Sequence, residues 1–90
     1  MKRVMDADAL GNMIFEHFQW LAGRGGTRLV LKDVIIYNYN FCFENLSCSV
    51  IRNCMFVDCI IEGVILHNAD WSGSEFVRTT LTGNKTKEIL

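Results

Sequence analysis

The 90-residue sequence contains no proline, and none of its apolar stretches approaches the ~18 residues that a membrane-spanning helix requires. The absence of proline suits a fold of many short paired strands, because proline cannot donate a backbone hydrogen bond to a neighbouring strand. Asp6 and Asp8 interrupt the first residues before any apolar block, so we expect no signal peptide. The formal net charge of −1 argues neither for nor against nucleic-acid binding. We therefore expect a cytoplasmic protein without a membrane contact.

The cysteines of this chain do not follow a metal-binding pattern. They are Cys42, Cys48, Cys54 and Cys59. Spacings of six, six and five residues match no zinc framework. In a cytoplasmic protein these side chains are expected to be reduced thiols. Cys54 and Cys59 are expected to fill the core as small apolar residues, so the sequence predicts neither a metal site nor a cofactor.

No set of side chains in the sequence resembles a catalytic site. A nucleophile, a base and a residue that orients the base cannot be assembled from the residues present. His67 is expected to be exposed, and Glu62 is the only acid within a few residues of it. We therefore expect no catalytic residues and no enzymatic activity, which leaves binding as the class of function.

The sequence has a five-residue period from Leu29 to Gly83. A helix repeats its apolar face every 3.6 residues and a strand every two, so this period fits neither alone. In this frame the third residue of every block is large and apolar. These residues are Leu31, Ile36, Phe41, Leu46, Ile51, Phe56, Ile61, Leu66, Trp71, Phe76 and Leu81.

The remaining positions of the block indicate how the chain bends. The fifth positions are rich in Asp, Asn and Gly, which favour turns. From Ser49 onward the first positions are small or medium in size. We expect positions one and three to point inward and position five to turn a corner. Successive coils would then stack about 4.8 Å apart and bury their faces against one another.

This pattern resembles the pentapeptide-repeat family, whose ideal block reads A-D/N-L-x-x and to which ADWSG at 69–73 is the closest match. The resemblance implies an all-β fold, a right-handed quadrilateral β-helix of just under three coils. Residues twenty apart would stack, as Leu31 under Ile51 and Ile36 under Phe56. Leu29, Tyr39 and Glu44 depart from the small first position. Because an unpaired buried charge is costly, we expect a distortion or a rim position at 43–45.

The segment before the repeats predicts a helix. Asp6 or Asp8 is placed to cap a helix that runs to about Ala22 and ends at Gly23. Its apolar face comprises Leu10, Met13, Ile14, His17, Phe18 and Leu21. We expect three segments: a helix and glycine-rich linker at 1–28, the repeats at 29–83 and a tail at 84–90.

This opening also resembles that of short pentapeptide-repeat proteins of phages and prophages. Their pattern is close to H-x-x-W-L-x-G-x-x-G-x-R-x-x-L. It is matched here by His17, Trp20, Leu21, Gly23, Gly26, Arg28 and Leu31. The helix is expected to cap the first coil and shield its backbone edge, and His17 and Trp20 are interpreted as parts of that cap.

Acidic residues exceed basic ones in the repeats, by six to three. The acids assigned to binding are Asp33, Asp58, Glu62, Asp70 and Glu75. Some members of the family resemble DNA in charge and width, so the resemblance suggests an inhibitor of a bacterial nucleic-acid-binding complex. A CRISPR effector is the first choice and DNA gyrase the alternative, without direct contact to nucleic acid. A solvated acidic surface remains open.

Two apolar sets suggest other interfaces. One is a belt of second positions, Val50, Met55, Ile60 and Ile65, which either lies under the helix or binds protein, so that an assembly module remains an alternative. The other is the last coil, with Trp71, Phe76 and Leu81. An open apolar end favours a homodimer through the C-terminal coil, or a cap formed by Ile89 and Leu90.

Overall fold

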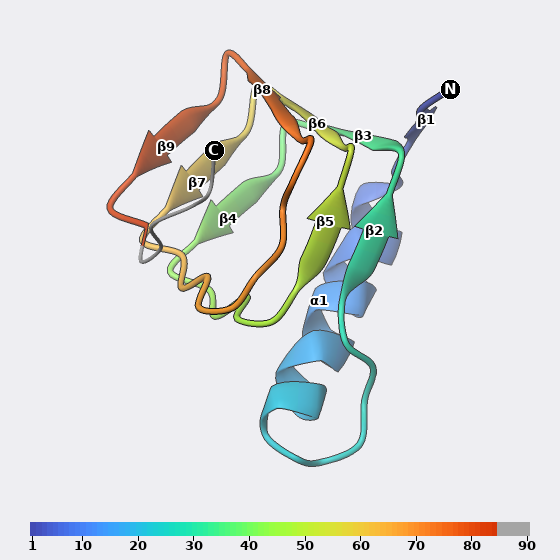
Figure 1. Cartoon of the computed structure of the whole chain (residues 1–90), viewed down its shortest axis with the longest axis vertical. Coiled ribbons are helices and arrows are strands. Elements are labelled where there is room, and N and C mark those ends of the chain that lie inside the picture. Colours follow the sequence, from blue (N-terminus) through green and yellow to red (C-terminus); the bar gives the residue numbers. More distant parts are fainter. Residues whose placement is uncertain (85–90) are drawn as a thin grey trace.

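The computed structural model describes residues 1–84, which form one helix and nine short strands (Figure 1). The elements in chain order are β1 (Arg3–Val4), α1 (Ala7–Leu21), β2 (Val30–Lys32), β3 (Val34–Tyr37), β4 (Asn40–Cys42), β5 (Val50–Arg52), β6 (Met55–Val57), β7 (Ile60–Glu62), β8 (Glu75–Val77) and β9 (Thr80–Thr82). Sheet A has the order β1-β3-β6-β8, sheet B pairs β2 with β5, and sheet C has the order β4-β7-β9. Within residues 1–84, no helix has the length and apolar character to cross a membrane.

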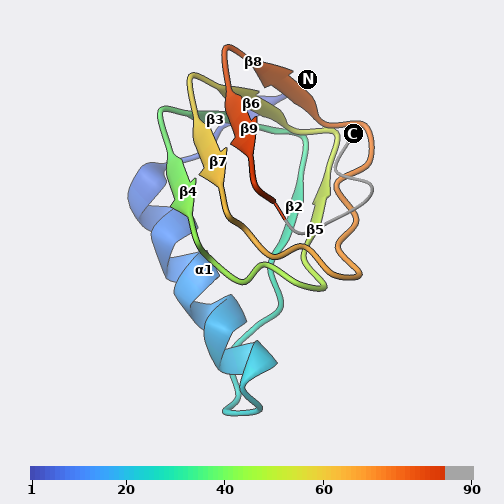
Figure 2. The same cartoon turned by 90° about the vertical axis from the view of Figure 1, so that its left-hand side faces the viewer.

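All strands of the repeats pair in parallel with an offset of twenty residues. Ile36 pairs with Phe56, and Phe56 pairs with Phe76, as the resemblance to the pentapeptide-repeat family implied. The same offset holds in sheets B and C. In sheet B, β2 lies beside β5, and in sheet C, β7 lies between β4 and β9 (Figure 2). On a fourth side Asn45 and Ile65 form an isolated bridge, and Cys48 N–H donates to the His67 carbonyl. The chain therefore returns to the same side every twenty residues.

The corners between the sides lie at the fifth position of every block. All eleven residues there have a positive φ: Asp33, Asn38, Phe43, Cys48, Asn53, Asp58, Gly63, Asn68, Gly73, Arg78 and Gly83. This confirms the prediction that position five turns the chain. Left-handed backbone is tolerated by Gly, Asn and Asp and is strained for other residues. The strained corners are thus Phe43, Cys48 and Arg78.

Small polar side chains at the first position join neighbouring layers at these corners. The Oγ of Ser74 accepts a hydrogen bond from the Cys54 backbone N–H and donates to the carbonyl of Ile51. Thr79 makes the same pair of contacts one corner later. The buried Cys59 thiol accepts from Tyr39 N–H and donates to the Ile36 carbonyl. Cys54 and Cys59 are buried as predicted, and Cys59 in addition satisfies backbone groups of the layer below.

Glu44 lies in the first layer, which is the rim position that the sequence left open as an alternative to a distortion at 43–45. The corner at Phe43 has the same left-handed backbone as the other corners. The Glu44 Oε1 is buried without a hydrogen-bond partner among the described residues, and burial raises the pKa of this carboxyl. The physical reason is its place in the first layer. Side chains at this position bond backbone groups of the layer below, and no layer lies below Glu44.

Aromatic rings fill the interior. The ring of Phe56 stacks on Trp71 at 5.2 Å and on Phe76 at 5.1 Å between ring centroids. Phe41 packs edge-on against Phe56. The Trp71 Nε1–H donates to the Oγ of Ser49, which donates in turn to the Leu46 carbonyl. A buried indole therefore has a partner, as its polar N–H requires.

Helix α1 covers the first layer. Asp6, one of the two predicted caps, accepts a hydrogen bond from the Ala9 N–H. The helix ends at Leu21 with Ala22 as its C-cap, and Gly23 follows with a φ of 72°, so the predicted end is confirmed to within one residue. Leu10 and Ile14 are buried in the core. The linker returns tightly along the helix, since a Cβ on Gly26 would lie 2.3 Å from the Glu16 carbonyl oxygen. The tight return explains the need for glycine at this position.

His17 connects the helix to the first layer. Its Nδ1 accepts a hydrogen bond from the Leu29 N–H at 2.9 Å, and its Nε2–H donates to the Ser47 carbonyl at 2.9 Å. The side chain is completely buried. The ring must be neutral to accept at Nδ1, and burial lowers the pKa of His17. His17 thus satisfies two backbone groups that the start of the repeats leaves without a strand partner.

Two further features concern the ends of the described chain. Strand β1, which the sequence did not predict, pairs with β3 through Arg3–Val34 and Val4–Ile35 and covers the edge of sheet A. The predicted fold-back of Ile89 and Leu90 lies outside the described residues, as does most of the predicted tail at 84–90.

Cys48→Asn is expected to stabilise the protein. Cys48 has a φ of 65°, a conformation that Asn adopts more readily, so we expect the free energy of unfolding to rise by about 0.5–1 kcal/mol. Urea unfolding measures the change. Cys42→Asn, at a fourth position with ordinary backbone, is the matched control. An equal or lower stability of the Cys48 variant would contradict the strain at this corner.

His17→Gln is expected to change the pH dependence of stability. Because burial lowers the pKa of His17 from 6.5, the unfolded chain binds the proton more readily. The stability that neutral His17 contributes is complete above pH 6.5 and is lost as the pH falls through 6.5 towards the folded-state pKa. Unfolding free energies measured across this range should fall less steeply for the Gln variant. His67→Gln, which replaces the exposed histidine, is the matched control, and a slope for His17→Gln equal to that of the wild type would contradict the assignment.

Candidate protein-binding surface

The outer surface of each sheet is formed by the second and fourth positions of the blocks, and the sheets differ sharply in composition. On sheet A these side chains are almost entirely apolar. We call them the sheet A face: Val4, Ile35, Tyr37, Met55, Val57 and Val77. Glu75 is the one charged residue in the same rows. The four strands lie together along the upper edge of the molecule (Figure 1).

The sheet A face combines exposed and packed side chains. Val4 is 64 % exposed and Tyr37 is 47 % exposed, whereas Val57 is 6 % exposed. Val57 lies between Tyr37 and Val77 in one row of the sheet. A contiguous apolar face with exposed rims and a packed centre is typical of a protein interaction site, since scattered single apolar residues need no such explanation.

Sequence reasoning found only part of this face. It considered the second positions as outward and so included Met55, but it left out the fourth positions, which supply Tyr37, Val57 and Val77. The signal was present, because positions two and four of an extended segment point to the same side. Val4 was missed for another reason, since β1 has only two residues and lies outside the period.

The predicted belt does not form one surface. Val50 lies in sheet B, Met55 in sheet A and Ile60 in sheet C, while Ile65 lies on the fourth side. Five residues carry the chain around one corner, so consecutive second positions face different directions. Ile60 is 41 % exposed and Val50 is 9 % exposed. A flat partner can touch at most part of this belt at once.

The five predicted acids do not act as five free charges. Arg78 pairs with Asp58 at 2.7 Å, and Arg52 pairs with Asp70 at 2.7 Å. Hydrogen bonds from Ser72 and from Arg52 lower the pKa of Asp70 to about 2. The hydrogen bond from Arg78 lowers the pKa of Asp58. These exposed pairs reduce the negative charge that the surface presents.

The other three acids lie on different parts of the surface. Asp33 lies at the corner before β3, where its carboxylate accepts from the Asn53 side chain. Glu75 lies in β8 of sheet A, and Glu62 lies in β7 of sheet C. Asp33, Glu62 and Glu75 form no ion pair with another described residue. The structure does not gather them into one patch.

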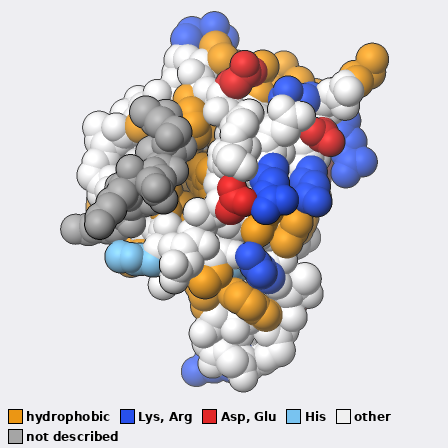
Figure 3. Space-filling model, in the orientation of Figure 1, with side chains coloured by type: hydrophobic (Ala, Val, Ile, Leu, Met, Phe, Trp, Pro, Cys, Tyr) orange, Lys and Arg blue, Asp and Glu red, His pale blue; other side chains and the backbone are white. Residues whose placement is uncertain are grey.

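Sheet B carries several basic side chains beside its acidic ones. Lys32 of β2 pairs in register with Arg52 of β5, and Arg28 lies just before β2. The Arg28 Nε–H donates to the Cys48 carbonyl at 2.7 Å, and its guanidinium lies 5.8 Å from the Trp20 ring centroid. Basic side chains gather with acidic ones on the face towards the viewer (Figure 3). Sheet B is therefore a mixed charged face rather than an acidic one.

The predicted dimer end is less open than expected. Trp71 is only 4 % exposed, because it packs on Phe56 and bonds Ser49. Phe76 and Leu81 are partly buried against the core. A homodimer through this end stays a prediction.

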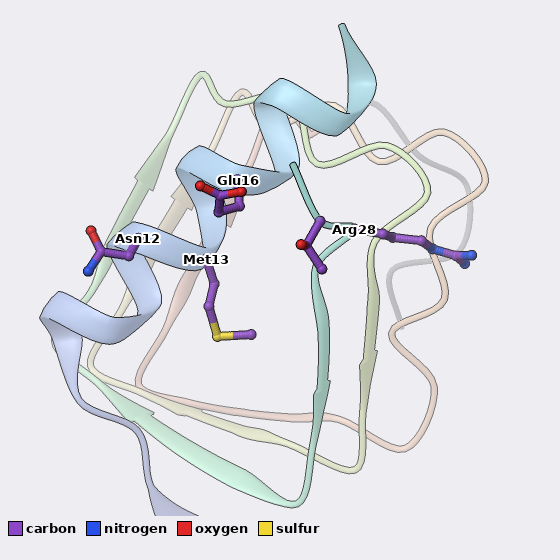
Figure 4. Close-up of a pocket in the computed structure, with 5 residues that line it drawn as sticks. Asn12, Met13, Glu16 and Arg28 are labelled. Atoms are coloured by element: carbon purple, nitrogen blue, oxygen red, sulfur yellow. The ribbon is translucent and has the colours of Figure 1, made fainter. Parts of the chain in front are cut away.

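A pocket of about 270 Å³ lies between α1 and the start of β2. Its lining residues are Asn12, Met13, Glu16, Thr27 and Arg28. Met13 points into the space below the helix, whereas the Arg28 side chain extends away from it (Figure 4). Binding sites for small molecules bring a few polar groups together around an apolar cavity. The polar groups here do not converge, so the pocket gives no specific ligand.

The side chains that could support chemistry are dispersed. Among residues 1–84, no three His, Cys, Asp or Glu side chains lie close enough together to hold a metal ion. Burial raises the pKa of the Cys54 and Cys59 thiols, which makes them poor nucleophiles. His67 is exposed on the fourth side.

Comparisons of the chain with protein-family models, curated proteins and solved structures found no match.

Proposed function

We propose that the repeats form a right-handed quadrilateral β-helix of the pentapeptide-repeat type. The offset of twenty residues between paired strands supports four blocks per coil. The left-handed backbone at every fifth residue supports a corner after each block. α1 then serves as the cap of the first coil, held by the two hydrogen bonds of His17.

The function that this geometry supports best is non-catalytic binding of a protein through the sheet A face. One observation carries the proposal: six apolar side chains from four adjacent strands form one outer surface. Desolvation of such a face on binding is favourable by about 25 cal/mol per Å² of apolar area. The flanking ion pair of Asp58 and Arg78 supplies a polar rim.

The resemblance of the sequence suggests the class of partner. Short proteins with this opening occur in phages and prophages, and we propose an inhibitor that binds a bacterial nucleic-acid-binding complex, with a CRISPR effector as the first candidate. On this view the sheet A face makes the contact. Binding would block the complex by occupation of its surface rather than by imitation of DNA.

A charge decoy for a DNA site, of a CRISPR effector or of gyrase, is the second candidate. It is favoured by Asp33 and Glu75, whose carboxylates form no ion pair with another described residue. It is disfavoured by the pairing of Asp58 and Asp70 with arginines. The two candidates differ in the force that holds the partner, which salt distinguishes because charge contacts are screened.

Capture from a bacterial lysate that contains a CRISPR effector, with a salt series in the wash, tests both candidates. We expect capture to survive high salt and to be lost in Tyr37→Glu, because a charge on the sheet A face must be desolvated. Thr80→Glu, which adds the same charge to an exposed position of sheet C, is the matched control and should bind normally.

The remaining outcomes separate the alternatives. Loss of capture at high salt and in the combined Asp33→Asn and Glu75→Gln variant would favour the decoy. Capture of only the chain's own copies, abolished by Tyr37→Glu, would assign the sheet A face to an assembly module. Absence of any binding that depends on Tyr37 would contradict the proposed function.

A further inference from the structure

A second feature lies at the corner between sheet C and the fourth side. A hollow of about 300 Å³ is lined there by Phe43, Glu62, Gly63, Thr82 and Gly83. It is separated from the sheet A face by the whole of sheet C, so its function is independent of the surface proposed above. The volume holds several water molecules at about 30 Å³ each, which is enough for one side chain of a partner.

The hollow exists because two side chains are missing from the corner. Phe43, Gly63 and Gly83 stack at intervals of twenty residues, and only the first has a side chain. The Phe43 ring lies directly over Gly63, since a Cβ there would come within 2.5 Å of the Phe43 Cδ1. At Gly83 a Cβ would meet nothing closer than the Gly63 nitrogen at 3.9 Å. The floor is therefore bare backbone beside an aromatic ring.

Phe43 is an unusual residue for this place. It is 76 % exposed and has a φ of 57°, and most other corners carry Asp, Asn or Gly. A bulky side chain in left-handed backbone is strained, and an exposed phenyl ring gains little from burial. Strain of this kind persists where the rest of the structure imposes it and is frequent at binding sites. The ring at this corner is thus available to a ligand.

The polar groups of the hollow select the charge of the ligand. Glu62 supplies a carboxylate that forms no ion pair with another described residue, and the Cys42 thiol lies 4.0 Å from its Oε1. The N–H groups of Phe43 and Gly63 already donate to the carbonyls of Glu62 and Thr82. They cannot also bind an anion. A carboxylate beside an aromatic ring suits a cation, which both groups attract.

We propose that this hollow binds a basic side chain, an arginine or lysine, of a protein partner. The guanidinium or ammonium group pairs with Glu62 and lies against the ring of Phe43, while its aliphatic stem rests on the backbone of Gly83, where the corner is open. Arginine is the better fit, because a planar guanidinium contacts a carboxylate and an aromatic ring at once.

Titration of the full chain with N-acetyl-arginine amide, followed by the amide resonances of Gly63 and Gly83, tests the site at low salt. N-acetyl-citrulline amide has nearly the same shape without the charge and serves as the control ligand. We expect saturable shifts with the arginine probe, and an affinity about threefold to tenfold weaker in Glu62→Gln. Phe43→Asn, which keeps the left-handed backbone without the ring, should weaken binding as well.

Three results would overturn the proposal. Equal shifts with the citrulline probe would show that charge is not recognised. Unchanged affinity in Glu62→Gln, with the variant folded as judged by its remaining resonances, would remove the carboxylate from the site. Binding seen only after Lys85→Gln and Lys87→Gln would assign the hollow to the chain's own basic residues instead of a partner. Unchanged binding in that double variant supports the proposal.

Discussion

The left-handed backbone at every fifth residue is the constraint on which the rest of this structure depends. A positive φ at every fifth residue from Asp33 to Gly83 turns the chain at equal intervals, so that each block places two side chains inward and two outward on its side of the molecule. Equal intervals also bring residues twenty apart into register. Parallel hydrogen bonds, the column of inward apolar residues and the composition of each outer face all follow from that spacing. Phe43, Cys48 and Arg78 have the same left-handed backbone at their corners, although this backbone is strained for such residues.

The inward side chains explain why the layers hold together at their corners as well as along their strands. Ser74 and Thr79 each bond one backbone N–H and one carbonyl of the layer below, and Cys59 does the same through its thiol. Ser49 holds the equivalent position above Leu29, but its Oγ bonds the Leu46 carbonyl and Trp71 instead, and the Leu29 N–H donates to His17. His17 also donates to the Ser47 carbonyl. Glu44 lies at a first position of the first layer, and its Oε1 has no partner among the described residues. Whether a first-position side chain finds a hydrogen-bond partner therefore depends on its layer as well as on its own chemistry.

Much of this arrangement could be predicted from the sequence because it depends on local properties. Large apolar third positions and turn-forming fifth positions define the period, and the family resemblance, with four blocks per coil, adds the register of Ile36 with Phe56. The ends of α1 follow from Asp6 and Gly23. The unpaired Oε1 of Glu44 could not be predicted, since it depends on what lies below the first layer. Strand β1 is too short to leave a pattern, and its pairing with β3 is set by the tertiary position of α1.

The surface was harder to predict than the core because charge and apolar side chains had to be placed on particular sides. Asp58 and Asp70 read as free acids in the sequence, yet each meets an arginine on a neighbouring layer or strand end. Because these two carboxylates are paired, the surface presents less negative charge, which favours the apolar sheet A face over an acidic decoy as the proposed binding surface. The belt of second positions is likewise dispersed by the corners. In this chain a surface is composed by one side of the molecule, from residues twenty apart, rather than by one stretch of sequence.

The most direct test of this account is the pattern of nuclear Overhauser effects between layers in the isotopically labelled protein. The account predicts contacts between backbone protons of residues twenty apart, from Ile36 to Phe56, from Phe56 to Phe76 and from Ile61 to Leu81. Such contacts would establish the register and with it the composition of every face. Contacts at another offset, or a helical pattern of short-range contacts in residues 29–83, would contradict the central claim.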